Sequence, residues 1–124
     1  MADRTLALKA AELLDKKGAM DIEILEVGQL TSITDYFVIA TGRNIQAVST
    51  LAEDLEEKLA EEGILPKRRD GMREARWIVL DYTGIIVHIF HPEERKYYNI
   101  ERLWNDGTNQ VAYVPVSERP ESQN

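Results

Sequence analysis

The sequence predicts a single α/β domain, and three stretches of the chain carry this prediction. Residues 77–80 and 85–90 are apolar runs rich in β-branched and aromatic side chains, and the segment 81–84 between them contains a glycine, which is typical of an antiparallel hairpin. Residues 36–40 form an uninterrupted apolar run, as in a central strand that is covered on both faces. Residues 45–59 carry apolar side chains at helical spacing. A chain of 124 residues corresponds to one domain and is long enough to bury a core.

The hairpin divides its side chains between two faces of different character, because side chains alternate along a strand. One face is the aliphatic core face, made of Ile78, Leu80, Tyr82, Ile85, Val87 and Ile89. The other, called the aromatic face below, is made of Trp77, Val79, Asp81, Ile86, His88 and Phe90. A two-residue turn at Thr83-Gly84 and a four-residue loop give the same faces, and only an odd-length loop would exchange partners between them. We therefore expect the aromatic face to be covered by something other than the main core.

The N-terminal half is predicted to contain two helices and one further strand. The first helix covers about residues 5–17, and a strand follows at residues 21–27. Its alternation slips at Leu25, which indicates a bulge or an edge position. The second helix is capped by Asn44 and ends at Gly63 as a left-handed C-cap.

The C-terminal half continues with a predicted loop at residues 64–74, then the hairpin, then a short helix that starts near Pro92. Apolar residues gather on one side of that helix, namely Tyr97, Tyr98, Ile100, Leu103 and Trp104. Beyond it the chain turns polar. We therefore predict a domain of residues 1–106 and a C-terminal extension of residues 107–124 that is largely disordered, with residues 111–116 able to add a β segment.

Composition and charge exclude several classes of protein. The chain has no cysteine, so disulfides, thiolate catalysis and cysteine metal sites are ruled out. No run approaches the ~20 apolar residues of a membrane-spanning helix, and the N-terminus lacks the apolar core of a signal peptide, so a cytoplasmic location is expected. The net charge of −7 argues against phosphate-backbone binding as the main activity and permits attraction to a basic partner.

Residue patterns associated with catalysis are weak throughout the chain. His88 and His91 point to opposite sides of an extended strand, so joint metal binding is not expected. Gly42 precedes a helix, but neither a Walker pattern nor a GxGxxG is present, which favours an ordinary strand-to-helix turn over a phosphate site. The basic residues between positions 67 and 76 have no interleaved aromatic residue, which favours a solvated connector over an RNA-binding element.

Three sequence blocks resemble the ribosomal silencing factor family (RsfS, also called Iojap). They are LTSITDYFVIATG at residues 30–42, WIVLDYTGIIVHIF at residues 77–90 and ERKYYNIERLWND at residues 94–106, with a long acidic helix between the first two. The resemblance covers about residues 5–106, with helices, strands and turns in the order of the family, and the three blocks at family-like spacing make it specific. The stretch beyond Asp106 lies outside it.

This resemblance implies a nucleotidyltransferase-like α/β fold, in which helices pack on a mixed β-sheet, without the catalytic motif. The nucleotidyltransferase signature is a Gly-Ser pair followed by spaced metal-binding aspartates. Ser32 and Asp35 lie in the corresponding region, but Leu30-Thr31 stands where the glycine would be. Members of the family have no demonstrated transferase chemistry, so the resemblance implies that the protein is not an enzyme.

The resemblance also implies a function in translation. The family binds the large ribosomal subunit through its ribosomal protein number fourteen, on a surface that faces the small subunit. Occupancy of this surface blocks subunit joining and represses translation when nutrients are scarce. Organelle relatives take part in large-subunit assembly. A steric role of this kind needs no cofactor, and we expect rRNA contacts to be peripheral at most and no membrane partner.

The aromatic face supplies the candidate partner-binding residues. Trp77 and Phe90 are expected to anchor in a pocket of the partner, and Asp81 to meet basic side chains of a ribosomal protein. Tyr82 belongs to the core face by alternation and qualifies only if its ring emerges at the turn. The terminal helix can bind the partner or simply lock the hairpin. The full set of candidates is Trp77, Asp81, Tyr82, His88, Phe90, Tyr98 and Trp104.

Two other classes of function remain open from the sequence. One is a divergent nucleotidyltransferase-like enzyme that binds a nucleotide and magnesium through the Gly42 turn and acids such as Asp35 and Asp81. The other is a self-associating scaffold whose aromatic face is buried in a homodimer. Members of the resembling family are often dimeric in isolation, so one face can serve both uses in turn.

Overall fold

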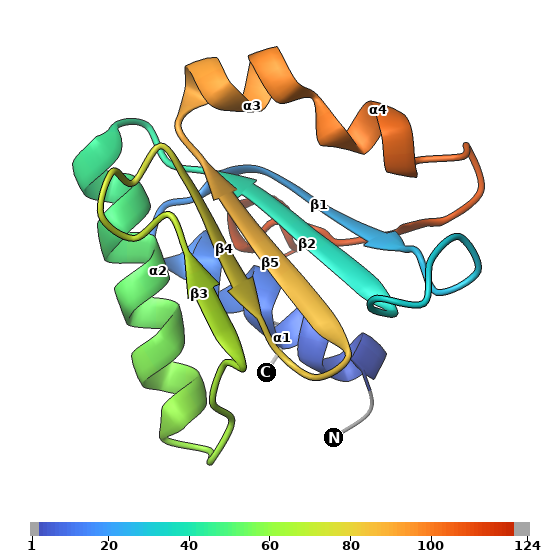
Figure 1. Ribbon diagram of the computed structural model, residues 1–124, viewed down its shortest axis with the longest axis horizontal. Coiled ribbons are helices and arrows are strands. Elements are labelled where there is room, and N and C mark those ends of the chain that lie inside the picture. Colours follow the sequence, from blue (N-terminus) through green and yellow to red (C-terminus); the bar gives the residue numbers. More distant parts are fainter. Residues whose placement is uncertain (1–2, 121–124) are drawn as a thin grey trace.

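The computed structural model describes residues 3–120 as one six-stranded sheet with helices on both faces (Figure 1). The strands are β1 (Met20–Glu26), β2 (Tyr36–Thr41), β3 (Arg68–Asp70), β4 (Trp77–Asp81), β5 (Ile85–Phe90) and β6 (Gln110–Val111). The helices are α1 (Asp3–Lys16), α2 (Ile45–Ala60), α3 (Pro92–Tyr98) and α4 (Ile100–Trp104), and a 3-10 turn, η1, covers Val116–Glu118. The α/β prediction and the single domain are confirmed.

The sheet is mixed and has the order β3-β4-β5-β2-β1-β6. Its one parallel pair joins β2 to β5, and the other neighbours are antiparallel. The chain between β2 and β5 crosses over through α2 and then adds β3 and β4 at the edge. Every residue of β2 and β5 is buried, so the prediction that residues 36–40 form a central strand is confirmed.

Helices lie on both faces of the sheet (Figure 1), and an apolar layer lies beneath the helices on each face. The larger layer packs α1 and α2 against one face, and it contains all six residues of the core face of the hairpin. The smaller layer lies under α3 and α4 and contains Phe37, Ile86, Phe90 and Ile100, with Trp77 and Trp104 packed against it. The aromatic face therefore has a partial cover from the same chain, at its α3–α4 side.

The hairpin has the predicted register. Ile78 lies opposite Ile89 and Leu80 opposite Val87, and the Tyr82 N–H donates to the Ile85 carbonyl at 2.9 Å. The turn is the two-residue one, and Gly84 has a φ of 92°, which glycine adopts without strain. Both faces therefore follow directly from the sequence.

The second helix begins as predicted. The Asn44 side chain accepts a hydrogen bond from the Ala47 N–H at 2.8 Å, which caps α2. A Cβ placed on Gly42 would lie 2.9 Å from both the backbone nitrogen and the Cγ2 of Val48. The missing side chain of Gly42 thus allows the first turn of α2 to pack against the strand end.

Two predictions about strands were wrong. Residues 68–70, predicted as part of a loop, form the edge strand β3, which pairs with β4 although its three residues are exposed. The irregularity of β1 lies between Met20 and Glu23 and not at Leu25. Leu25 is fully buried because β6 pairs beyond β1 and the sheet is covered on both sides there.

The helix after the hairpin is divided in two. Pro92 and the His91 cap begin α3 as its sequence suggests, but Asn99 adopts a left-handed φ of 45° and separates α3 from α4. Asparagine tolerates this conformation better than most residues. The break turns α4 over the sheet, so that Ile100 is buried there while Leu103 is 77% exposed.

The C-terminal extension is more ordered than its composition predicts. β6 pairs with β1 through Val111, and the Tyr113 hydroxyl and the Val116 N–H both donate to Asp15 on α1 at 2.7 Å. The β segment that the sequence allows at residues 111–116 is therefore present at Val111, and Tyr113, Val116 and Arg119 have contacts with α1 that a largely disordered extension does not include. Residues 121–124 lie outside the described part of the chain.

Among the described residues, none of the helices has the length and apolar character needed to cross a membrane.

We expect Tyr113→Phe to lower the free energy of unfolding by about 1 kcal/mol, because it removes a hydrogen bond to the Asp15 carboxylate. Urea denaturation measures this change. Tyr97→Phe is the matched control, since Tyr97 is 81% exposed and its change should leave stability as it is. Equal stability of the Tyr113→Phe and wild-type proteins would contradict docking of the extension on α1.

Candidate partner-binding surface

Trp77 lies at the end of the aromatic face that is next to α3, opposite Phe90 in the strand register. Its ring stacks on Phe90 with centroids 4.9 Å apart and planes 24° from parallel, and the Tyr98 ring from α3 lies 4.7 Å away. The Trp77 side chain remains half-buried, so part of the indole faces solvent. Neighbouring rings hold the indole on two sides. Because its position is already fixed, it can contact a partner and lose little further side-chain freedom.

His88 fixes the orientation of that indole. The Trp77 Nε1–H donates to His88 Nδ1 at 3.1 Å. Because Nδ1 accepts this bond, the proton of a neutral imidazole is on Nε2. Nε2 is buried and has no hydrogen-bond partner among the described residues. Burial lowers the pKa of His88 to about 4, so the ring is neutral at pH 7 and the indole–imidazole bond is intact.

A chain of aromatic contacts extends from Trp77 and His88 towards α4. The Phe37 ring on β2 meets His88 at 4.9 Å and Trp104 at 5.3 Å, each with planes 81° apart. Trp104 is half-buried at the end of α4. Phe37 was not among the predicted site residues, because the apolar run of β2 hides which residues share a face. The parallel pairing of Phe37 with Ile86 places it on the aromatic face.

The outer side of α3 and α4 adds exposed apolar groups beside the same surface. Tyr98 is 46% exposed, and it contacts both Trp77 and the neighbouring Tyr97. Tyr97 and Leu103 are 81% and 77% exposed. We use the name docking surface for the accessible part of this region, which comprises Trp77, Val79, Asp81, Tyr98, Leu103 and Trp104.

Three predicted partner-binding residues do not reach this surface, and one of them is His88, which is buried and accepts the hydrogen bond of the Trp77 indole. Tyr82 is 1% exposed on the opposite face, and burial raises the pKa of its hydroxyl to about 12. Its ring does not emerge at the turn, because the two-residue turn keeps Tyr82 in register with Ile85. Phe90 is fully buried beneath Trp77, so it supports the indole from behind and offers no surface to a partner.

Asp81 is half-buried at the end of β4, on the same face as Trp77. Arg68 on β3 lies opposite it in the strand register. The docking surface thus has an acid at its edge with a base on the neighbouring strand, beside its aromatic groups, and polar groups around an aromatic patch are usual in protein interfaces.

Comparison with known proteins identifies the family. A family model described as "Ribosomal silencing factor during starvation" matches residues 2–124. The chain is 37% identical over 106 residues to the ribosomal silencing factor RsfS of Bacillus subtilis. The aligned region covers 86% of this chain and 90% of that protein. This protein belongs to the RsfS family. The match extends beyond Asp106, where the resemblance of the sequence blocks ends.

Further relatives and solved structures agree with this assignment. The RsfS of Halalkalibacterium halodurans is 36% identical over 86% of this chain and 91% of its own. A mouse protein named "Mitochondrial assembly of ribosomal large subunit protein 1" is 27% identical over 88% of this chain and 50% of its own length. A crystal structure of a Chromobacterium violaceum protein superposes with a TM-score of 0.82 at 29% identity, covering 95% of this chain and 98% of that one.

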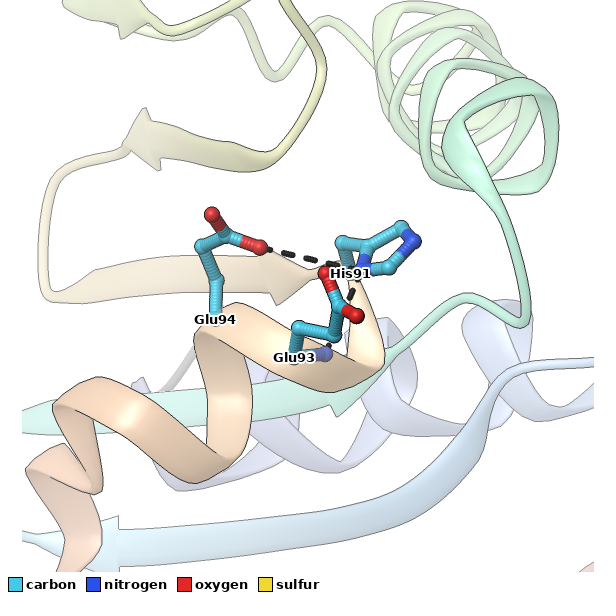
Figure 2. A group of neighbouring side chains, drawn as sticks. All are labelled: His91, Glu93 and Glu94. Atoms are coloured by element: carbon cyan, nitrogen blue, oxygen red, sulfur yellow. Dashed lines mark hydrogen bonds and ion pairs between the residues drawn. The ribbon is translucent and has the colours of Figure 1, made fainter.

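The RsfS-family chain has one group of three side chains, among its described residues, that could hold a metal ion: His91, Glu93 and Glu94 (Figure 2). Each member already has a structural partner. His91 Nδ1 accepts from the Glu93 N–H at 3.2 Å and so caps α3. Arg76 binds Glu93 at 3.0 Å and Glu94 at 2.8 Å, and it lowers the pKa of the Glu94 carboxyl. Ion pairing and capping account for the cluster, and the helix N-terminus disfavours a cation.

The residues of the alternative enzyme hypothesis are not gathered in this RsfS-family chain. Asp35 lies beside Asp3 at the start of β2, where a hydrogen bond between the two carboxyls raises the pKa of Asp3. Asp81 belongs to the docking surface on β4, and Gly42 packs against Val48 at the other end of β2. The structure therefore does not bring the Gly42 turn and these two acids together.

We expect acid to destabilise this protein partly through His88. Its pKa is about 4 in the folded protein and 6.5 for an unperturbed histidine, so the unfolded chain binds the extra proton between these values. This contribution to stability is complete above pH 6.5 and is lost as the pH falls towards 4. At pH 5 the loss is about 2 kcal/mol at 1.36 kcal/mol per pH unit.

Urea denaturation of wild type and His88→Gln at pH 7 and pH 5 measures this effect. The glutamine can still accept from the Trp77 indole but does not titrate, so its loss of stability on acidification should be smaller. His91→Asn is the control, because it keeps an N-cap acceptor and leaves His88 in place. Equal pH dependence of wild type and His88→Gln would show that His88 titrates normally.

Proposed function

We propose that this protein is a ribosomal silencing factor that binds the large ribosomal subunit through ribosomal protein number fourteen and blocks joining of the small subunit. The result is repression of translation. The observation that carries this proposal is the docking surface, where half-buried Trp77 and Trp104 and exposed Tyr98 lie together on one side of an RsfS-family domain. Aromatic residues of this kind dominate the energetics of protein interfaces.

Charge supports a ribosomal protein as the partner. The chain carries a net charge of −7, and Asp81 lies at the edge of the docking surface. Ribosomal proteins are generally basic, so the fields of the two partners attract and speed their encounter. Contacts to rRNA are peripheral in this proposal, because Arg69 and Arg76 of the basic segment already pair with glutamates of the same chain.

The mechanism is steric. A domain of this length is ~30 Å across, and bound on the subunit interface it occupies space that the small subunit needs. No turnover or cofactor is required, and the protein acts in the cytoplasm. A role in large-subunit biogenesis is compatible with the same binding, as the name of the mouse relative suggests for that protein. When no ribosome is present, the docking surface can pair with a second copy as a homodimer.

Subunit joining tests the proposal directly. Purified small and large subunits are mixed with increasing amounts of the protein, and complete ribosomes are separated on a sucrose gradient. We expect complete ribosomes to decrease and the protein to sediment with free large subunits only. Full association in the presence of saturating protein would overturn the proposal, and sedimentation with small subunits would place its partner elsewhere.

We expect Trp77→Ala to weaken binding to large subunits by about 30-fold or more, since truncation of a central interface tryptophan costs about 2 kcal/mol or more. The fold should persist, because the core layer under α1 and α2 does not include Trp77. Co-sedimentation with large subunits measures the binding, and circular dichroism checks the fold. Leu65→Ala is the control, as Leu65 is 68% exposed in the loop after α2. Normal binding by folded Trp77→Ala would reject the docking surface.

Salt should weaken this binding only moderately. A contact dominated by a ribosomal protein releases few counterions, whereas a protein that neutralises about 6–10 phosphates loses about 10³–10⁵ in affinity between 50 and 200 mM salt. The affinity for large subunits measured over this range distinguishes the two. A steep dependence that Arg68→Ala reduces would point to rRNA at the β3 edge in place of a protein contact.

A further inference from the structure

Arg95 is a buried charge that the docking surface does not use directly. It lies on α3, and its side chain is nine-tenths buried. Its Nε donates to Glu101 on α4 at 2.8 Å, and Nη1 donates to the Thr41 hydroxyl on β2 at 2.8 Å. Nη2 lies 3.5 Å from Glu23 on β1. One side chain thus joins four elements, and we call this set the Arg95 clamp.

Stability alone does not explain the Arg95 clamp. Removing a guanidinium and two carboxylates from water is costly, and apolar replacements of buried ion pairs are often neutral or stabilising. The compensation here is incomplete, because Glu101 Oε1 is buried without a hydrogen-bond partner among the described residues. Burial also raises the pKa of the Glu23 carboxyl even though Arg95 lies beside it.

The clamp acts where apolar packing is sparse. A surface hollow of about 550 Å³ lies beside it between β1 and α4, and its lining is mostly polar, with Asp21, Glu23, Arg95, Glu101, Asn105 and Gln110. The helices are short, and the left-handed Asn99 separates them. Helices of this length do not hold a fixed position by their own hydrogen bonds, so their placement depends on tertiary contacts.

What the clamp holds in place is half of the docking surface. Tyr98 follows Arg95 by three residues and contacts Trp77, and Trp104 follows Glu101 by three residues and contacts Phe37. Residues three apart lie on neighbouring positions of a helix surface, so a shift of Arg95 or Glu101 moves the ring beside it. The clamp residues and the rings therefore occupy neighbouring positions on the same two helices.

We propose that Arg95 is a positioning residue, whose ion pair with Glu101 and hydrogen bond to Thr41 preorganise α3 and α4 so that Tyr98 and Trp104 meet the partner in a single arrangement. This inference rests on the proposed function, because it assigns to the buried charge a role in binding large subunits. Preorganisation raises affinity by reducing the ordering cost of association.

The test replaces the ion pair by apolar side chains of similar length, in the double variant Arg95→Met with Glu101→Met. We expect a thermal unfolding midpoint within a few degrees of wild type, faster hydrogen exchange of the amides of residues 95–104, and binding to large subunits about tenfold weaker. The control is Arg119→Met with Glu12→Met, an ion pair of 3.2 Å between the C-terminal extension and α1, on the other face of the sheet. This control should leave both exchange in α3–α4 and binding unchanged.

Each outcome decides the inference. Wild-type affinity in the folded double variant, or unchanged exchange at residues 95–104, overturns it. If the double variant does not fold, the single variant Glu101→Gln is tested, since it keeps a neutral hydrogen bond to Arg95. We expect it to show a smaller loss of binding and the same local increase in hydrogen exchange. Wild-type binding and wild-type exchange in Glu101→Gln would then overturn the inference. If wild-type protein itself fails to bind large subunits while the double variant still increases exchange, the proposed function is overturned, and the assignment to partner binding falls with it.

Discussion

The structure depends on one constraint, the alternation of side chains along the β4–β5 hairpin. Both faces of this hairpin are apolar, so the sheet must be covered twice. The aliphatic face needs only an apolar cover, and the leucine and alanine side chains of α1 and α2 provide it. The aromatic face is covered only in part, because α3 and α4 together are too short to span it. The accessible remainder is the docking surface.

Neighbours within the chain hold the Trp77 indole of the docking surface in place. Phe90 supports the Trp77 indole from behind, His88 accepts its N–H, and Tyr98 packs beside it. The indole therefore has its polar atom satisfied internally and presents apolar ring to solvent. A partner that covers it gains buried apolar area and does not have to supply a hydrogen bond to Nε1.

The chain accepts local costs around this surface. His88 carries a donor without an acceptor among the described residues, Glu101 an oxygen without a partner there, and Asn99 a left-handed backbone. Each is unfavourable by itself, and all three lie in the layer of α3 and α4. The layer of α1 and α2 is mainly aliphatic and carries two such features, the buried Tyr82 hydroxyl and the left-handed backbone of Ala75 at a φ of 56°. Costs of this kind commonly gather at functional sites, where a particular arrangement is worth more than maximal stability.

Short-range patterns were sufficient for much of the fold. The hairpin register, the central position of β2, the Asn44 cap and the start of α3 at Pro92 all depend on residues close together in sequence. The family followed from three local motif blocks. Strand β3 escaped prediction because three exposed polar residues have no periodic pattern, and only pairing with β4 makes them a strand.

What the sequence by itself determined was which side chains share a face of the hairpin, because the two-residue repeat of a strand needs no tertiary information. The tertiary structure alone decided which of those side chains are accessible. Phe90 and Trp77 belong to the same face, yet Phe90 is fully buried and Trp77 is only partly buried, since the α3–α4 cover reaches only part of the sheet. The tertiary structure also brought two residues from elsewhere into this region. Phe37 comes there through the parallel pairing of β2 with β5. Arg95 contacts Thr41, which is distant in sequence, and the left-handed Asn99 separates its helix from α4.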